Sequence, residues 1–106
     1  MVSNRILSLL GLCIKAGKLK SGEFGTTEAV KSFKAYVVIV ASDASDNTKK
    51  EFRDMCSFYE VPYYEYSTKE ELGRAIGKDL RSSVAVCDEG FSKSLISYLE
   101  KKSAEN

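Results

Sequence analysis

The sequence predicts an α/β fold, a three-layer α/β/α sandwich around a four-stranded sheet. Apolar residues at helical spacing alternate with short runs of strand-forming residues, in the order α-β-α-β-α-β-α-β-α. Residues 36–41 are apolar at every position, as in a strand that helices cover on both faces. The 106 residues contain no linker and no internal repeat, which fits one domain. We expect this domain to span residues 1–100, followed by a frayed polar tail at residues 101–106.

The N-terminal third predicts a helix, a short strand and a second helix. Apolar residues from Ile6 to Ile14 recur every three or four positions, which predicts an amphipathic helix. Gly17 comes just after this pattern and is a typical helix stop. Leu19 centres a short strand, and a second helix begins near Glu23 and leads to the buried strand at residues 36–41.

The rest of the chain predicts three more helices and two more strands. The turn and cap residues 42–47 open the third helix, and residues 61–66 form a strand with Pro62 near its start or on an edge. A capping box then opens a short fourth helix. Two pairs fit this box: Ser67 with Glu70, and Thr68 with Glu71. Residues 83–87 predict a second buried strand, and the last helix begins near Gly90.

The composition narrows the possible functions. The chain has no histidine and three cysteines without a Cys-x-x-Cys pair, which excludes the commonest zinc sites and every histidine-based triad, so we expect no metal. Cys13, Cys56 and Cys87 lie among apolar residues and predict buried free thiols. No apolar run approaches the roughly 20 residues that span a bilayer, and the N-terminal stretch lacks a signal-peptide cleavage pattern. We therefore expect a soluble, cytoplasmic protein with no membrane partner.

Acidic residues after the two buried strands raise the alternative of a magnesium-dependent enzyme. Asp43 follows the first strand, and Asp88 and Glu89 follow the second. If the two strands were parallel neighbours, these carboxylates would converge at one edge of the sheet. Aspartate between a strand and a helix is also a common helix cap, and we favour this interpretation. Because P-loop and dinucleotide-binding spacings are absent as well, we predict a protein that is not an enzyme and holds no cofactor.

The basic residues lie in two segments, although the net charge is only +1. Residues 1–34 contain six basic and two acidic residues, and residues 73–81 contain three basic and one acidic residue. The intervening residues 43–72 contain eight acidic and four basic residues. Either these segments are ordinary solvated helix faces, or together they attract a negatively charged partner.

Residues 15–27 predict a short basic strand that passes through glycines into a helix start. Free backbone N–H groups at the helix start, with Lys18 and Lys20 beside them, form a site of phosphate size. Lys31 extends the basic face along this helix. The second basic segment, residues 72–86, predicts a helix, a glycine-containing loop and a strand. If its loop lies beside the first turn, the two segments form one concave nucleic-acid site.

These segments and others resemble a known family. The resemblance is carried, in order and spacing, by GLCIKAGK at 11–18, SGE at 21–23, AYVVIVA at 35–41, DASDNTKK at 43–50, ELGRAIGK at 71–78, VAV at 84–86 and DEGF at 88–91. Through them the chain resembles the L7Ae/L30e family of kink-turn RNA-binding ribosomal proteins, most of all its bacterial YlxQ-type members. The resemblance implies a mixed sheet that brings the first turn next to the loop after the fourth helix.

The resemblance also implies a mode of binding. In this family the turn at the second helix docks in the widened major groove of a kink-turn, where polar side chains meet tandem sheared G·A pairs, and the later loop packs against a flipped-out base. By position, Gly22 would be the tight-turn glycine, and residues 80–83 would cover the extruded nucleotide. The chain departs from the family pattern at Phe24 and Gly25, where RNA-reading members have asparagine or lysine and then glutamate or glutamine. It departs again at Glu28, where they usually have lysine. Phe24 fits two roles, stacking on a base or a hydrophobic staple at the helix start.

The leading hypothesis is a ribosome-associated RNA-binding protein that docks on structured, kink-turn-like RNA, ribosomal RNA in particular. The predicted RNA-binding residues are Lys18, Lys20, Ser21, Gly22, Glu23, Phe24, Gly25, Thr26, Lys31, Leu80, Arg81, Ser82 and Ser83. The alternative is a protein–protein adaptor of the ribosome or the transcription machinery. Such an adaptor would use the acidic segment and the tyrosines Tyr63, Tyr64 and Tyr66.

Overall fold

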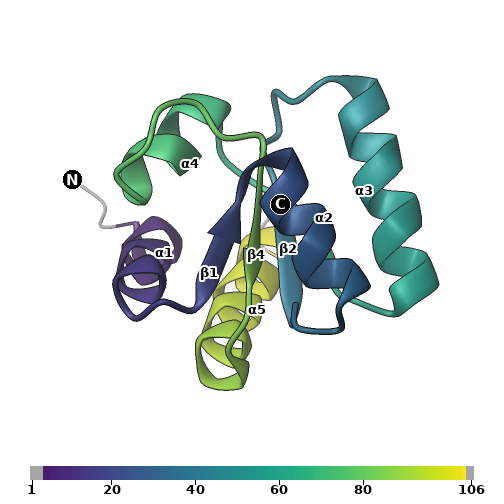
Figure 1. The fold of residues 1–106 in the computed structure, drawn as a ribbon. Helices are drawn as coiled ribbons and strands as arrows, with labels where there is room; N and C mark the ends of the chain where they lie inside the picture. The colour runs from purple at the N-terminus through teal and green to yellow at the C-terminus, as the bar shows by residue number, and fades with distance from the viewer. Residues whose placement is uncertain (1–3, 105–106) are drawn as a thin grey trace.

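The structure, a computed structural model, describes residues 4–104 and shows the predicted order of helices and strands. The elements are α1 (Arg5–Lys15), β1 (Leu19–Ser21), α2 (Gly22–Lys31), β2 (Val37–Val40), α3 (Asp46–Tyr59), β3 (Tyr63–Glu65), α4 (Lys69–Ala75), β4 (Ser83–Val86) and α5 (Glu89–Ala104). Helices α2 and α3 pack against each other on one face of the sheet, and α1 packs against α4 and α5 on the other (Figure 1). The three-layer α/β/α sandwich is therefore confirmed.

The sheet is mixed, with the strand order β1-β4-β2-β3. Strand β4 pairs antiparallel with both β1 and β2, whereas β3 pairs parallel with β2. Every residue of the two central strands is buried, because helices cover both faces of the sheet. Pro62 comes just before the edge strand β3, where its missing N–H leaves no gap in the ladder.

Side chains cap the starts of α1, α3 and α4, and the caps of α3 and α4 lie in segments that the sequence predicts as caps. Thr68 accepts a hydrogen bond from the Glu71 N–H at 3.1 Å, so Thr68, the first residue of the second pair, is the one that caps α4. The Glu71 carboxylate accepts a hydrogen bond from the Ser67 hydroxyl at 2.7 Å. Asn4 and Ser45 cap α1 and α3 in the same way. Each cap satisfies a backbone donor that the helix leaves unpaired, an effect worth about 1 kcal/mol.

Four helices end in the same motif, with a left-handed residue directly after the last turn. The residue with positive φ is Gly17 after α1 and Gly77 after α4, but Phe33 after α2 and Glu60 after α3. In each motif the N–H of this residue and the next N–H bond back to two carbonyls of the last turn, as in a Schellman motif. Glycine adopts this conformation freely, whereas other residues lose about 1–2 kcal/mol in it.

The interpretation of Asp43 and Asp88 as a converging acidic pair is wrong, because β2 and β4 are antiparallel. The two aspartates therefore follow opposite ends of the sheet. Asp43 accepts a hydrogen bond from the Lys69 N–H at 2.8 Å and so caps α4, and Asp88 accepts one from the Phe91 N–H at 2.9 Å and so caps α5. Within residues 4–104, no three histidine, cysteine or acidic side chains come together as metal ligands would.

The C-terminal helix is longer than the sequence indicates. Helix α5 continues to Ala104, so the first residues of the predicted tail are helical, and residues 105–106 lie outside the described part. The division into a domain and a tail stays a prediction. None of the helices between residues 4 and 104 combines the length and the apolar character that crossing a bilayer requires.

Candidate nucleic-acid interface

The turn between β1 and α2 depends on a glycine. Ser21 is extended, with φ −138° and ψ 162°, and Gly22 then turns to φ +83°. No atom lies within 4 Å of the position that a Cβ on Gly22 would take. Gly22 is thus required by its backbone conformation and not by lack of space, as a tight-turn glycine should be.

The start of α2 presents free backbone donors. Ser21 occupies the N-cap position but makes no capping hydrogen bond with its side chain. Among the described residues, the N–H groups of Gly22, Glu23 and Phe24 have no acceptor. Free donors and the positive end of the helix dipole together favour an anion at this point.

Two exposed lysines lie on the strand side of this turn. Lys18 precedes β1 and Lys20 lies within it. The Cβ of Lys20 is 3.6 Å from the place that a Cβ on Gly25 would take, so Lys20 lies against the first turn of α2. Lys31 lies in the last turn of the same helix, about 14 Å from the first residue of the helix at a rise of 1.5 Å per residue. None of these three lysines forms an ion pair within residues 4–104.

The second predicted segment lies directly beside the first. Because β1 and β4 are antiparallel, Ser21 at the end of β1 pairs with Val84 at the start of β4. The Arg81 Nε donates a hydrogen bond to the Ser21 Oγ at 3.2 Å. The Ser83 hydroxyl donates to the Gly22 carbonyl oxygen at 3.2 Å. Two segments that are 60 residues apart in the chain therefore form one continuous surface.

The predicted site residues divide by exposure. The exposed ones are Lys18, Lys20, Glu23, Phe24, Lys31 and Leu80, and the half-buried ones are Ser21, Gly22, Gly25, Arg81 and Ser82. Thr26 and Ser83 are fully buried, and their hydroxyls lie 3.0 Å apart in a hydrogen bond. Their side chains face the core, where they hold α2 against β4. The neighbouring exposed residues are therefore the ones that can contact a ligand.

Backbone contacts with α4 position the loop before β4. The Arg81 N–H donates to the Lys69 carbonyl at 3.1 Å, and the Lys78 N–H donates to the Gly73 carbonyl at 2.8 Å. Gly73 is buried in α4, and a Cβ there would lie only 1.5 Å from the Asp79 carbonyl oxygen. Sequence reasoning missed this role of Gly73, although a glycine inside a helical pattern is a signal of close approach.

The sequence model of the Ribosomal protein L7Ae/L30e/S12e/Gadd45 family matches residues 4–96. The chain belongs to this family.

Relatives and solved structures agree with this membership. The chain is 44% identical over 92 residues to RNA-binding protein YlxQ of Bacillus subtilis (strain 168), a match that covers 87% of this chain and 92% of the relative. It is 41% identical over 96 residues to RNA-binding protein YlxQ of Enterococcus faecium, covering 91% and 92%. These relatives are named as binding proteins, in keeping with the prediction that the chain is not an enzyme.

Two solved structures share the fold. A protein with unknown function from Bacillus halodurans C superposes with a TM-score of 0.88 at 39% identity, covering 92% of this chain and 99% of the other. The Giardia lamblia 15.5kD RNA binding protein superposes with a TM-score of 0.77 over 95% and 92% of the two chains. Its identity of 20% makes this second match evidence for the fold alone.

Of the positions at which this chain departs from the pattern of the L7Ae family, Phe24 is the one that the structure explains best. Its side chain is 79% exposed. A hydrophobic staple would join the residue before the N-cap to the fourth helical residue, and those positions hold Lys20 and Gly25. The staple interpretation is therefore wrong, and the ring projects freely beside the unpaired N–H groups.

The three thiols of this L7Ae-family member are unsuited to nucleophilic chemistry. Cys13 and Cys56 are buried, and burial raises the pKa of each to about 11. Cys87 is half-buried instead of buried; burial raises its pKa, while the positive charges of Lys20 and Lys34 act in the opposite direction. A thiol with a raised pKa stays protonated near neutral pH and reacts slowly.

The tyrosines predicted as an adaptor surface are tied to the fold. Tyr63 donates a hydrogen bond to Glu65 at 2.8 Å, Tyr64 donates to Glu100, and Tyr66 accepts one from Asn4 at 2.9 Å. All three rings are half-buried and pack against the core. This segment therefore offers little free aromatic surface to a protein partner.

Proposed function

We propose that this protein binds structured RNA without catalysing a reaction, through the surface made by residues 18–25 and 80–82, here called the two-loop surface. The observation that carries the proposal is the hydrogen bond between Arg81 and Ser21. It joins the two basic segments, which supports one shared binding surface over two unrelated solvated faces. The name of the family and the names of the relatives support RNA as the partner.

The chemistry of the two-loop surface suits a bent RNA backbone. The free N–H groups at the start of α2 can bind one phosphate, and Lys20 and Arg81 can neutralise its neighbours. Beside the loop lies an open hollow of about 540 Å³, large enough for an unstacked base. Its lining includes Arg74, Lys78 and Leu80 and also the carboxylates of Glu70 and Asp79. These features support a kink-turn-like RNA as the target. The finer prediction is that this RNA is ribosomal and that the protein works in the cytoplasm in association with the ribosome.

The two-loop surface is better suited to binding the RNA backbone than to recognising G·A pairs specifically. Gly25 has no side chain to read a base edge, and the exposed carboxylate of Glu28 repels phosphate. The exposed ring of Phe24 offers stacking in place of hydrogen bonds, and stacking tolerates every base. We therefore propose that the protein recognises the bend of the RNA more than its sequence.

A titration against three RNAs tests the proposal. The first is a hairpin with a kink-turn, the second replaces the G·A pairs with Watson–Crick pairs, and the third is a plain duplex of equal length. Binding is followed by fluorescence anisotropy at several salt concentrations. We expect the kink-turn RNA to bind tightest, with an affinity that falls steeply as salt rises.

Matched lysine variants locate the surface. Lys20→Ala should weaken binding to all three RNAs and lower the salt slope by about one, because one phosphate contact is lost. Lys93→Ala removes the same charge from α5, in the other helix layer, and should change neither quantity. Binding that ignores salt, equal effects of the two substitutions, or no binding at low ionic strength would contradict the proposal.

A further inference from the structure

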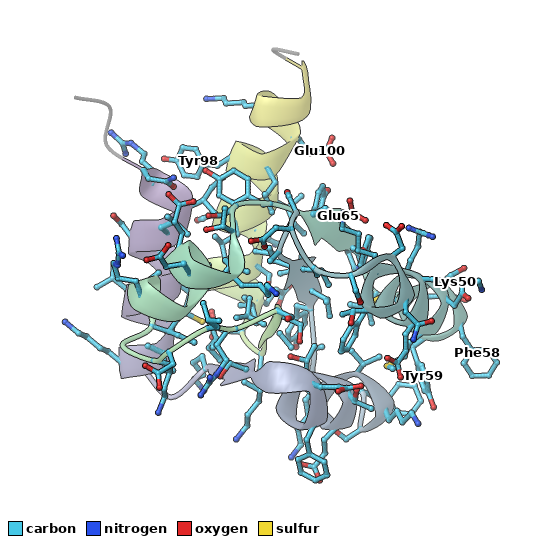
Figure 2. All side chains as sticks on the ribbon, turned by 90° about the horizontal axis from the view of Figure 1, so that it is seen from above. Lys50, Phe58, Tyr59, Glu65, Tyr98 and Glu100 are labelled. Carbon is cyan, nitrogen blue, oxygen red and sulfur yellow. The ribbon has the colours of Figure 1, made fainter. Side chains whose placement is uncertain are left out.

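Three aromatic side chains form an exposed cluster at the C-terminal ends of α2 and α3. The Tyr59 ring makes edge contacts with Phe33 and Phe58, with ring centroids 5.5 and 5.0 Å apart. Phe33 is 80% exposed and Phe58 is 78% exposed. Figure 2 shows Phe58 pointing away from the end of α3, with Tyr59 next to it. We call these three residues the aromatic cluster.

The backbone beside this cluster is strained. Phe33 has φ +62° and Glu60, next to Tyr59, has φ +59°. The equivalent positions after α1 and α4 hold Gly17 and Gly77, which adopt such angles without cost. Phe33 completes the end of α2 through the two hydrogen bonds of its Schellman motif, but at a cost that glycine would avoid, and its ring gains little burial. The helix end therefore does not require a phenylalanine, and the exposed ring is free to contact a partner.

Lysines connect the aromatic cluster with the two-loop surface. Lys31 and Lys34 flank Phe33 in the chain, and neither forms an ion pair among the described residues. Lys20 lies against the first turn of α2, because its Cβ is 3.6 Å from the place that a Cβ on Gly25 would take, and Lys31 lies in the last turn. Lysines therefore stand at both ends of α2, a helix about 15 Å long.

Two carboxylates near the aromatic cluster form no ion pair among the described residues. Glu28 is in the last turns of α2 and Glu60 ends α3, and both are exposed. A third carboxylate, Asp54, is already neutralised by Lys50 at 2.7 Å. The charges of Lys31 and Lys34 balance those of Glu28 and Glu60, so the net positive charge comes from Lys18 and Lys20 at the other end of α2.

We propose that the aromatic cluster stacks unpaired nucleotides that continue from an RNA bound at the two-loop surface. This inference rests on the proposed function, because the bound RNA supplies the strand that reaches the cluster. Exposed rings give bases flat faces to stack on, and the lysines pair with the phosphates between those bases. An apolar peptide would use the rings but gain nothing from the lysines at the two ends of α2.

The test compares tailed and untailed forms of one kink-turn hairpin. The tail is about six unpaired adenosines, within the roughly 4–16 nucleotides that a single-strand-binding module covers, and is placed on each end in turn. A third RNA carries a tail of abasic nucleotides with the same phosphates. We expect one adenosine tail to raise affinity roughly tenfold and the abasic tail to raise it much less, because one stacked base is worth about 1–3 kcal/mol.

Variants then assign the gain to the aromatic cluster. Phe33→Gly with Phe58→Ser removes both exposed rings, and glycine suits the positive φ at position 33, so the fold should persist; a thermal melt checks this. Leu12→Ser, which removes another exposed apolar side chain from α1, is the matched control. The double variant should bind tailed and untailed RNA equally, whereas the control should keep the difference.

A fluorescent base provides an independent readout. With 2-aminopurine in the tail, stacking on the cluster should quench its emission in the wild type and not in the double variant. If the hairpin binds but no tail changes its affinity, the inference fails while the proposed function stands. If the double variant instead loses a protein captured from nuclease-treated extract, the cluster is a protein-binding surface and the inference is wrong. If no RNA binds at all, both proposals fail.

Discussion

Replacing Gly73 with alanine tests how the fold holds the loop that carries Leu80 and Arg81. The new Cβ would lie 1.5 Å from the Asp79 carbonyl oxygen, and such contacts are not shorter than 3.0 Å, so the loop must retreat by about 1.5 Å. Overpacking of this kind costs about 1–3 kcal/mol. The hydrogen bonds from Lys78 and Arg81 to α4 would be strained too, at about 1 kcal/mol each.

The net effect should be a loss of about 2–4 kcal/mol in the free energy of unfolding, because alanine returns about 0.5–1 kcal/mol of helix propensity. For a domain of this size, that lowers Tm by on the order of 10–20 °C. Urea and thermal denaturation followed by circular dichroism measure both quantities. RNA affinity should fall as well, since Arg81 would move away from Ser21 although no side chain at the two-loop surface has changed.

Two other helical glycines supply a graded control. A Cβ on Gly25 meets only the Lys20 Cβ at 3.6 Å, an ordinary contact, so Gly25→Ala should stabilise the protein by about 0.5–1 kcal/mol. A Cβ on Gly11 would lie 2.9 Å from the Ala75 carbonyl oxygen, which predicts an intermediate effect. Equal stability of the Gly73 and Gly25 variants would refute the close approach of the loop to α4.

Three further predictions concern buried groups and the turn. Ser83→Ala should cost about 1–3 kcal/mol because it leaves the buried Thr26 hydroxyl without its partner, and adding Thr26→Val should recover part of this loss in a double-mutant cycle. Gly22→Ala should cost about 1–2 kcal/mol through its positive φ, and chemical denaturation would reveal a smaller loss if the turn is not strained. The raised pKa values of Cys13 and Cys56 mean that the native state keeps both thiol protons longer than the unfolded chain. Stability should therefore be unaffected by these thiols below about pH 9 and should fall between pH 9 and 11, which a series of denaturation curves would detect.

The helices and strands could be predicted from the sequence because their signals are local. The apolar period of α1, the glycine after it and the helix cap at Thr68 each lie within a few residues, and the structure confirms all three. The relative direction of strands is a long-range property with no local signal. For this reason the sequence could not show that β2 and β4 are antiparallel, and the possible convergence of Asp43 and Asp88 was wrong.

For the candidate site as well, local features could be predicted from the sequence, whereas contacts between distant segments could not. The glycine turn and the basic residues were visible in the sequence, whereas the closeness of the first turn to the loop after the fourth helix was expected only through the family resemblance. The hydrogen bond between Ser21 and Arg81 is a finding of the structure. Ser83 was expected both in a buried strand and in the RNA-binding loop, and the structure buries it. The burial of Thr26 was missed, because hydroxyl residues are mostly exposed and only the packed structure shows that Thr26 and Ser83 satisfy each other. The role of Gly73 was missed since its neighbour, Asp79, belongs to the loop that folds back onto α4.

The hydrogen bond between Ser21 and Arg81 has a thermodynamic consequence for ligand screening. A ligand that contacts both of the segments joined by this bond finds its site only when β1 and β4 are paired, so it binds the native state and not the unfolded chain. Such a ligand raises the stability of the whole domain by about 2.7 kcal/mol when its concentration is 100 times its Kd. The melting temperature of the unlabelled protein can therefore rank RNA fragments by affinity, and a fragment of either half of the chain should show no such response.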